Sequence, residues 1–232
     1  RDLRRVPGDL SVAAGRARRT EAFRVLTVGS DCATGKMTAA LEIRRELEDR
    51  GLDCGFGATG QTGIALAGSG IAVDAVKADF VAGAAERLTV EAAAGRDAVM
   101  VEGQGALFHP GYSGVTLGLL HGVMPEAMVL TWMPNRPRIH GEDYAWTRLP
   151  PLDDIVRAYE EAARWARPAD TAGDPPRVVA VSCTTYEMEE APAREAVDRA
   201  RELTGLPASD PVRHGPGPLA DAVEAAVEGR RD

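Results

Sequence analysis

Short apolar runs alternate with longer amphipathic segments along most of the chain. Runs typical of buried parallel strands lie at residues 24–28, 54–58, 97–102, 127–132 and 177–182. Apolar residues at helical spacing predict helices at residues 36–50, 71–94, 152–166, 193–203 and 218–229. Strands that alternate with helices in this way predict one α/β domain, with a mostly parallel central sheet between two layers of helices.

The composition of the chain excludes several classes of function. Of the 232 residues, 44% are hydrophobic and 27% are charged, which is typical of a packed globular domain. The net charge of −8 argues against a protein that binds a nucleic-acid backbone, because such a protein needs a basic face. No apolar stretch approaches the ~20 residues of a membrane span, no leader segment is visible, and three scattered cysteines form no disulfide framework. We therefore expect a cytoplasmic protein that binds neither nucleic acid nor membrane.

The strongest chemical signal is VGSDCATGKMT, residues 28–38, between the first predicted strand and the first predicted helix. The N–H groups of such a loop and the start of the helix after it attract phosphate. Gly29 and Gly35 tolerate close approaches or backbone angles that a Cβ would hinder, and Lys36 can fold back to meet a β- or γ-phosphate. The expected cofactor-binding residues are Gly29, Ser30, Asp31, Cys32, Ala33, Thr34, Gly35, Lys36, Met37 and Thr38.

This loop departs from the Walker A pattern at two positions. The usual first glycine, with four residues between it and Gly35, is replaced by Ser30. Met37 follows Lys36 where a serine or threonine usually binds Mg²⁺, and Thr38 lies about 100° further round the helix. The loop still favours phosphate binding over an ordinary glycine-rich turn, but it leaves the need for Mg²⁺ open.

Two carboxylates are candidate metal ligands. Glu102 ends the third predicted strand, and ligands of open α/β sheets bind at the carboxyl ends of the strands. There it would lie near Lys36 as a Mg²⁺ ligand or general base, or alternatively cap the next turn. Asp74 and Asp79 cannot share one face of a helix, and we expect Asp74 to bind a metal or the substrate amine.

Other polar residues follow the predicted strands. Gln61 and Thr62 could orient a polar substrate or form a polar turn. In HPGYSG, His109 could transfer a proton, and Tyr112 and Ser113 could bind a carboxylate, although a single histidine is often structural.

Two further residues are candidates with plain alternatives. Arg136 could bind a substrate carboxylate or cofactor phosphate, or it could be an exposed loop arginine. The start of the helix should lower the pKa of Cys32, which leaves an acylated cysteine as an alternative mechanism.

These motifs resemble those of two protein families. The loop from Gly29 to Lys36, with Glu102-Gly103, is similar to dethiobiotin synthetase, an enzyme that activates carboxyl-type substrates with ATP and Mg²⁺. The blocks GSDCATGKMTAALE, ATGQTGIALAGSGIAVDAVKADFVAGAAE, VEGQGALFHPGYSGVTLGLLHG and TGLPASDPVR resemble P-loop proteins of the D-glutamate N-acetyltransferase type. The longer resemblance implies a three-layer P-loop NTPase-like fold, acetyl-CoA as cofactor and acyl transfer to an amino acid such as D-glutamate.

The two resemblances imply different roles for the same residues. In acyl transfer, Glu102 or His109 would take the proton of the attacking amine, while Lys36 holds charge; Met37 fits this chemistry. In ATP-dependent activation of a carboxylate by a ligase or kinase, Glu102, Asp74 and Asp31 would surround Mg²⁺ and Lys36 would neutralise the γ-phosphate. The substrate is then a small amino acid or carboxylate.

The first 22 residues differ from the rest. Six arginines, together with Pro7, Gly8 and Gly15, show no sustained period, which is typical of a linker or a solvated arm. The resemblance implies that residues 1–22 follow an N-terminal Rossmann-like domain and that residues 23–232 form the P-loop domain. Because related folds often build sites across subunits, we also expect a homo-oligomer.

Overall fold

The strands form a single parallel sheet. The computed structural model describes residues 2–144, 146–167 and 175–231. The sheet has the order β2-β3-β1-β4-β5-β6, and all its strand pairs are parallel. The strands are β1 Phe23–Gly29, β2 Cys54–Gly57, β3 Ala98–Val101, β4 Ala127–Trp132, β5 Arg177–Cys183 and β6 Ala208–Ser209.

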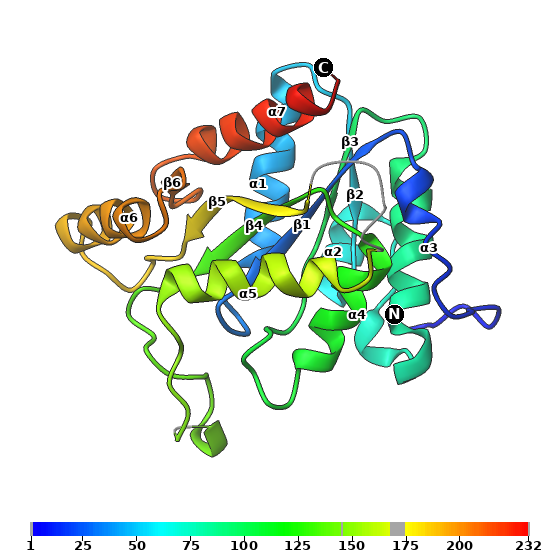
Figure 1. The fold of residues 1–232 in the computed structure, drawn as a ribbon, viewed down its shortest axis with the longest axis horizontal. Coiled ribbons are helices and arrows are strands. Elements are labelled where there is room, and N and C mark those ends of the chain that lie inside the picture. Colours follow the sequence, from blue (N-terminus) through cyan, green and yellow to red (C-terminus); the bar gives the residue numbers. More distant parts are fainter. Residues whose placement is uncertain (1, 145, 168–174, 232) are drawn as a thin grey trace.

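Helices cover both faces of this sheet (Figure 1). They are α1 Lys36–Asp49, α2 Gln61–Ala67, α3 Val81–Ala93, α4 Ser113–Val123, α5 Leu152–Arg164, α6 Glu190–Thr204 and α7 Gly217–Arg231. Residues of α1 and α7, such as Ile43 and Val223, pack on one face, and residues of α3, α4, α5 and α6, such as Leu88 and Tyr159, pack on the other. The predicted three-layer P-loop NTPase-like α/β fold is confirmed.

Burial explains why the strands were predictable. Every residue of β1 is buried, as expected of a central strand with helices on both sides. The five predicted strands agree with β1 to β5 to within one residue at each end. Short β6 and helices α2 and α4 were not predicted. Most of the segment between the predicted helix at 152–166 and the predicted strand at 177–182 lies outside the described residues.

The predicted helix at 71–94 is wrong in its first half. Residues before α3 form two 3-10 turns, η2 Val73–Ala75 and η3 Ala78–Phe80. The main-chain N–H groups of Ile71 and Val73 donate to Ala58 O and Thr59 O, which holds this segment against the chain that leaves β2. Both N–H groups are thus bonded to the chain after β2 and are not used in bonds within a helix.

The basic N-terminal segment is held against α3. The carboxylate of fully buried Glu86 accepts hydrogen bonds from the main-chain N–H groups of Ala14 and Arg16, and the Arg16 side chain forms an ion pair with it at 2.7 Å. A short 3-10 helix, η1 Ala17–Arg19, follows. Within the described residues, no helix combines the length and apolar character that crossing a membrane requires.

Candidate functional site

The β1–α1 connection is a tight loop at the carboxyl edge of the sheet. Gly35 has φ +88° and precedes α1; a Cβ there would lie 2.8 Å from Thr184 Oγ1. The loop is fixed to β4, because Ser30 N–H donates to Thr131 O at 2.9 Å. It is fixed to the end of β5 as well, because Thr184 Oγ1 donates to Thr34 O at 2.8 Å.

Lys36 folds back across this loop. Its Nζ donates to Asp31 O at 2.8 Å and lies 3.4 Å from Thr34 Oγ1. A Cβ on Gly29 would lie 2.7 Å from that Nζ, so a glycine is needed where the ammonium crosses the loop. The residue is 7% exposed, and burial lowers the pKa of Lys36 to about 8.

The loop also presents main-chain donors. Within the described residues, the N–H groups of Ala33 and Gly35 have no hydrogen-bond acceptor in the protein. They precede the first turn of α1, whose N-terminus carries partial positive charge. Together with the Lys36 ammonium they form a concentrated set of donors suited to a phosphate or diphosphate.

Glu102 lies directly after β3, but its carboxylate is bound to a neighbouring turn. Its Oε2 accepts the N–H groups of Thr59 at 3.0 Å and Gly60 at 3.1 Å, just before α2. A Cβ on Gly63 would lie 2.3 Å from this oxygen, so α2 starts against the carboxylate. The sequence left open a cap on the turn that follows Glu102, whereas the turn bound here lies 42 positions earlier in the chain. Burial raises the pKa of Glu102, although these N–H groups and Lys36 act in the opposite direction.

Lys36 and Glu102 nevertheless share one edge of the sheet. A Cβ on Gly103 would lie 3.2 Å from Lys36 Cδ, so the lysine stem passes over the residue after Glu102. Among the described residues no ion pair within 4.0 Å joins the two charges. Each is nearly buried and each feels the other's charge.

A segment between β4 and α5 lies over the loop. Fully buried Asp31 accepts the main-chain N–H of His140 at 2.7 Å and that of Cys32 at the same distance. Arg136 donates to Cys32 O at 2.7 Å and lies 3.4 Å from the Asp31 carboxylate. Arg136 therefore contacts the β1–α1 loop and is not an isolated surface arginine.

Burial under this segment corrects the expectation for Cys32. The start of α1 should lower its pKa, but burial raises the pKa of the Cys32 thiol and outweighs the nearby charges of Lys36 and Arg136. The predicted lowering was wrong because a segment more than one hundred positions away covers the loop, which the local motif does not reveal.

His109 is buried beside the loop. Its Nδ1 accepts the N–H of Gly111 at 3.1 Å, and its ring lies 4.5 Å from the rings of both Tyr112 and Tyr144. In its neutral form the ring then carries its proton on Nε2. One side-chain ligand atom each from His109, Asp31 and Cys32 lie within 4.8 Å of one another.

The remaining predicted residues are more exposed than Lys36, Glu102 and His109. Gln61 and Thr62 are exposed in the first turn of α2, next to the turn that Glu102 binds, and half-exposed Tyr112 and partly buried Ser113 lie at the start of α4. Asp74 is exposed in η2.

No hydrogen bond or ion pair connects Asp74 with Glu102 or the loop within the parts of the chain described. The reasoning that placed Asp74 and Asp79 on one helix was wrong, because they lie in separate 3-10 turns. Binding of a metal or substrate by these residues stays a prediction.

Sequence reasoning missed two supports of the site. The buried hydroxyl of Tyr159 donates to Gly29 O at 2.7 Å and accepts Leu107 N–H at 3.2 Å, which ties α5 to the loop and to the chain after β3. In the sequence Tyr159 is one more apolar position of a helix, and nothing there marks its hydroxyl.

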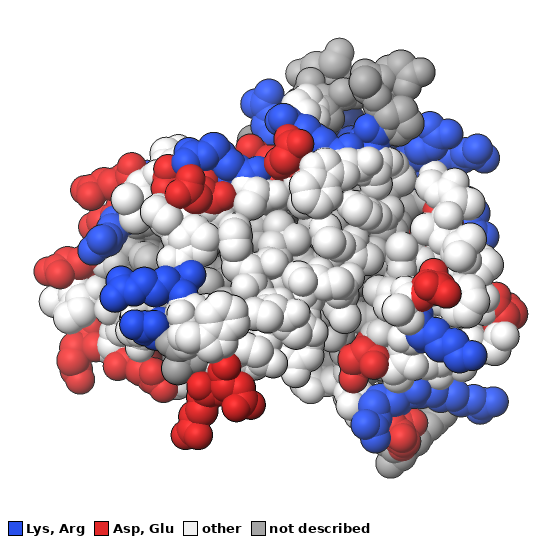
Figure 2. Space-filling view, turned by 60° about the horizontal axis from the view of Figure 1, so that its bottom comes forward, with Lys and Arg blue, Asp and Glu red and all other residues white. Residues whose placement is uncertain are grey.

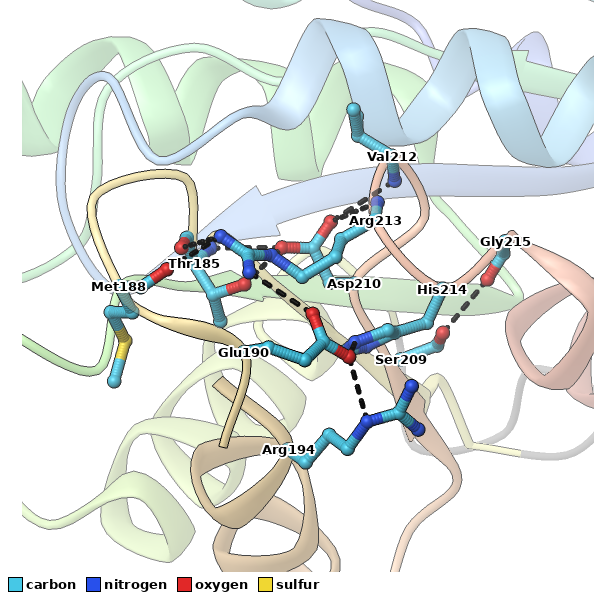
Figure 3. A network of polar contacts seen from close by, with 10 residues as sticks. All are labelled: Thr185, Met188, Glu190, Arg194, Ser209, Asp210, Val212, Arg213, His214 and Gly215. Atoms are coloured by element: carbon cyan, nitrogen blue, oxygen red, sulfur yellow. Dashed lines mark hydrogen bonds and ion pairs between the residues drawn. The ribbon is translucent and has the colours of Figure 1, made fainter. Parts of the chain in front are cut away.

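The second support is buried Asp210, directly after β6 (Figure 3). Its carboxylate accepts Thr185 N–H and Oγ1, and the N–H groups of Val212 and Arg213. The Arg213 guanidinium donates back to Thr185 O and Met188 O. This network holds together the two loops after β5 and β6. In the sequence Asp210 follows the short pair Ala208-Ser209, which shows no strand pattern, so nothing there marks it.

Charges of both signs lie around the rim of the face in Figure 2, and its centre is mostly uncharged. That view turns the lower side of Figure 1 forward. This face therefore carries no broad basic surface.

A family model and two relatives with known names match this chain over most of its length. A family model described as "Domain of unknown function (DUF1611_C) P-loop domain" matches residues 11–220. Two D-glutamate N-acetyltransferases are similar: that of Tritonibacter scottomollicae is 41% identical over 95% of this chain, and that of a Pseudoalteromonas species 37% identical over 88%. These matches cover 63% and 58% of the two relatives, so the chain spans about three fifths of their length.

Solved structures support the same fold. A DUF1611 family protein from Anabaena variabilis superposes with a TM-score of 0.90 at 39% identity, covering 97% of this chain and 63% of that protein. A cobyrinic acid a,c-diamide synthase from Mycobacterium smegmatis, solved with ADP and magnesium, has a TM-score of 0.55 at 13% identity, covering 88% of this chain and 92% of that one. The second likeness concerns the fold alone.

Proposed function

Because the chain belongs to the DUF1611_C family of P-loop domains, we propose that it is the P-loop domain of an amino-acid N-acetyltransferase. The reaction would transfer an acyl group from acetyl-CoA to an amino acid such as D-glutamate, the substrate in the names of the two similar enzymes. In this proposal residues 23–232 form the P-loop domain, and residues 1–22 are the arm that joins it to an N-terminal Rossmann-like domain.

The observation that carries the proposal is the buried Lys36 ammonium inside a loop of free main-chain donors. Coenzyme A contains a diphosphate, which such a loop can bind without breaking a phosphate bond. Met37 supports acyl transfer, since it supplies no hydroxyl to hold Mg²⁺ beside the loop. The loop thus suits phosphate binding better than phosphate transfer.

Glu102 is the better candidate for the general base. The amine nitrogen of the acceptor attacks the thioester carbonyl, the C–S bond breaks, and the amine proton must leave. Glu102 is a carboxylate at the same edge with a raised pKa, whereas the Nδ1 lone pair of neutral His109 is used by Gly111 N–H. With the diphosphate in the loop, the pantetheine arm must return along the carboxyl edge for its thioester to reach Glu102.

Other predicted residues would supply the contacts to the substrate. We propose that Arg136 binds a carboxylate or phosphate beside Asp31, and that Gln61, Thr62, Tyr112 and Ser113 contact the amino acid.

We also propose that the enzyme is a homo-oligomer. Light scattering after size-exclusion chromatography measures this directly, and a monomer mass would contradict it.

A single assay tests the reaction. The full-length enzyme is incubated with D- or L-glutamate and either acetyl-CoA or ATP with Mg²⁺, and free thiol and free phosphate are measured. Thiol release that depends on the amino acid, without phosphate, supports acyl transfer. Lys36→Met should abolish the signal, while Lys77→Met, at the only other lysine and exposed, should leave it unchanged.

The second candidate is ATP- and Mg²⁺-dependent activation of a carboxylate by a ligase or kinase. The observation that favours it is Glu102, a strand-end carboxylate that shares an edge with Lys36 and could hold Mg²⁺, with Asp74 and Asp31 as further ligands. Phosphate release that depends on the amino acid would establish this reaction and overturn the first. Release of neither product would overturn both.

A further inference from the structure

Three potential metal ligands of different chemistry converge beside the loop. A carboxylate oxygen of Asp31, Sγ of Cys32 and a ring nitrogen of His109 all lie within 4.8 Å of one another. Asp31 and His109 are buried, and Cys32 is partly buried. Across residues 2–144, 146–167 and 175–231, no other group of three or more His, Cys, Asp or Glu side chains meets this distance.

We propose that Asp31, Cys32 and His109 bind a divalent zinc ion, or a similar cation of borderline softness. A set of one oxygen, one sulfur and one nitrogen donor suits Zn²⁺, whereas Mg²⁺ and Ca²⁺ prefer oxygen alone. With Zn–ligand distances of about 2.0–2.3 Å, ligand atoms on one ion lie roughly 3–4 Å apart. The side chains therefore need to close by only about 1 Å.

The surroundings orient two of these ligands. Both oxygens of Asp31 accept main-chain N–H groups, one from Cys32 and one from His140, and metal-binding carboxylates are usually held by such outer contacts. Burial raises the pKa of the Cys32 thiol, although Lys36 and Arg136 act in the opposite direction, so a bound cation must displace the thiol proton. One carboxylate and one thiolate then balance the two charges of the cation.

Binding of a cation by His109 would break an existing hydrogen bond. A neutral imidazole has a single in-plane lone pair, and Gly111 N–H uses it at 3.1 Å. A bound cation must take this lone pair and release Gly111. The rings of Tyr112 and Tyr144, each 4.5 Å away, restrict how far the imidazole can move in response. Metal binding should therefore speed hydrogen exchange at the Gly111 amide.

Three protein ligands leave a fourth position for water or a substrate oxygen, as in catalytic zinc sites. This site shares Asp31 with the Mg²⁺ site of the ATP-dependent alternative, but it adds Cys32 and His109, whose sulfur and nitrogen atoms Mg²⁺ does not prefer. Its occupancy is measured without turnover, so it stands or falls independently of the acetyltransferase proposal.

The test uses full-length protein without a histidine tag, stripped of metal and titrated with Co²⁺. We expect one Co²⁺ per chain, a thiolate-to-cobalt charge-transfer band in the near ultraviolet, and loss of that band on addition of Zn²⁺ but not Mg²⁺. Cys32→Ser should abolish the band and His109→Gln should weaken Co²⁺ binding at least tenfold. Cys183→Ser is the control, since its buried thiol at the end of β5 belongs to no such group.

Two results would overturn the proposal: no Co²⁺ bound by the wild-type protein, or a charge-transfer band that survives in Cys32→Ser. Circular dichroism and urea unfolding establish that each variant is folded. If His109→Gln does not fold, Cys32→Ser still decides the matter, because it replaces a partly exposed thiol by a hydroxyl of similar size. Exchange at Gly111 that is unchanged by saturating Zn²⁺ would remove His109 from the ligand set.

Discussion

Replacing Lys36 by methionine should stabilise the protein at neutral pH in a way that disappears as the pH rises. Burial lowers the pKa of Lys36 from 10.5 to about 8, which destabilises the folded protein by roughly 3 kcal/mol at neutral pH. Methionine keeps the length of the stem without the charge. Loss of the hydrogen bond to Asp31 O offsets about 1–3 kcal/mol, so the net gain at pH 7 is about 0–2 kcal/mol.

The pH dependence is the sharper part of this prediction. Because the folded pKa lies below the unfolded pKa, the unfolded state binds more protons between them, and wild-type stability rises with pH in that window. The destabilising effect is fully present below about pH 8 and lost as the pH rises towards 10.5. The free-energy difference between wild type and variant should therefore shift by about 1 kcal/mol between pH 7 and pH 9.

Urea unfolding of wild type, Lys36→Met and Lys77→Met at both pH values measures this shift. Titrating groups that do not feel the charge of Lys36 cancel in the difference between proteins, and exposed Lys77 should give no pH-dependent difference. A Lys36→Met effect that is equal at pH 7 and pH 9 would refute the buried cation. The same burial predicts that an anionic cofactor binds more weakly to wild type above pH 8.

Three further variants test the supports of the site. Glu102→Gln should lower kcat at least 100-fold with little change in CoA affinity, measured by steady-state kinetics and calorimetry; unchanged kcat would remove the general base. Gly63→Ala places a Cβ 2.3 Å from the Glu102 carboxylate and should cost about 1–3 kcal/mol in urea unfolding, whereas the exposed Gly229→Ala control should not destabilise. Tyr159→Phe removes the hydroxyl bonded to Gly29 O and should cost about 1–3 kcal/mol and weaken CoA binding; wild-type stability in this variant would contradict that role.

Much of the scaffold could be predicted because it depends on local pattern. The apolar runs of β1 to β4 are almost entirely buried, which is what a run without alternation indicates. The β1–α1 loop was identifiable because glycines and Lys36 stand at fixed positions between a strand and a helix. The path of Lys36 over Gly29 follows that expectation.

Helix α4 could not be predicted because its glycines serve packing rather than a turn. A Cβ on Gly122 would lie 2.1 Å from Ala82 O, and one on Gly118 would lie 2.5 Å from Val81 Cγ1. These glycines allow α4 to pack closely on α3, yet they lower intrinsic helix propensity and mask the segment in the sequence.

The environment of the site was harder to predict because it comes from distant segments. The burial of Cys32 depends on Arg136 and His140, more than one hundred positions away. The capping of α2 by Glu102 likewise joins residues 42 and 43 positions apart. Neither contact follows from spacing along the chain.

The central claim is that the loop from Gly29 to Thr38 binds the diphosphate of coenzyme A. Calorimetric titration of the full-length enzyme with CoA and with pantetheine, which lacks the diphosphate, tests it most directly. We predict that CoA binds, that pantetheine binds far more weakly, and that Lys36→Met reduces the affinity for CoA to that for pantetheine. Equal affinity for the two ligands, or CoA binding unchanged in Lys36→Met, would contradict the account.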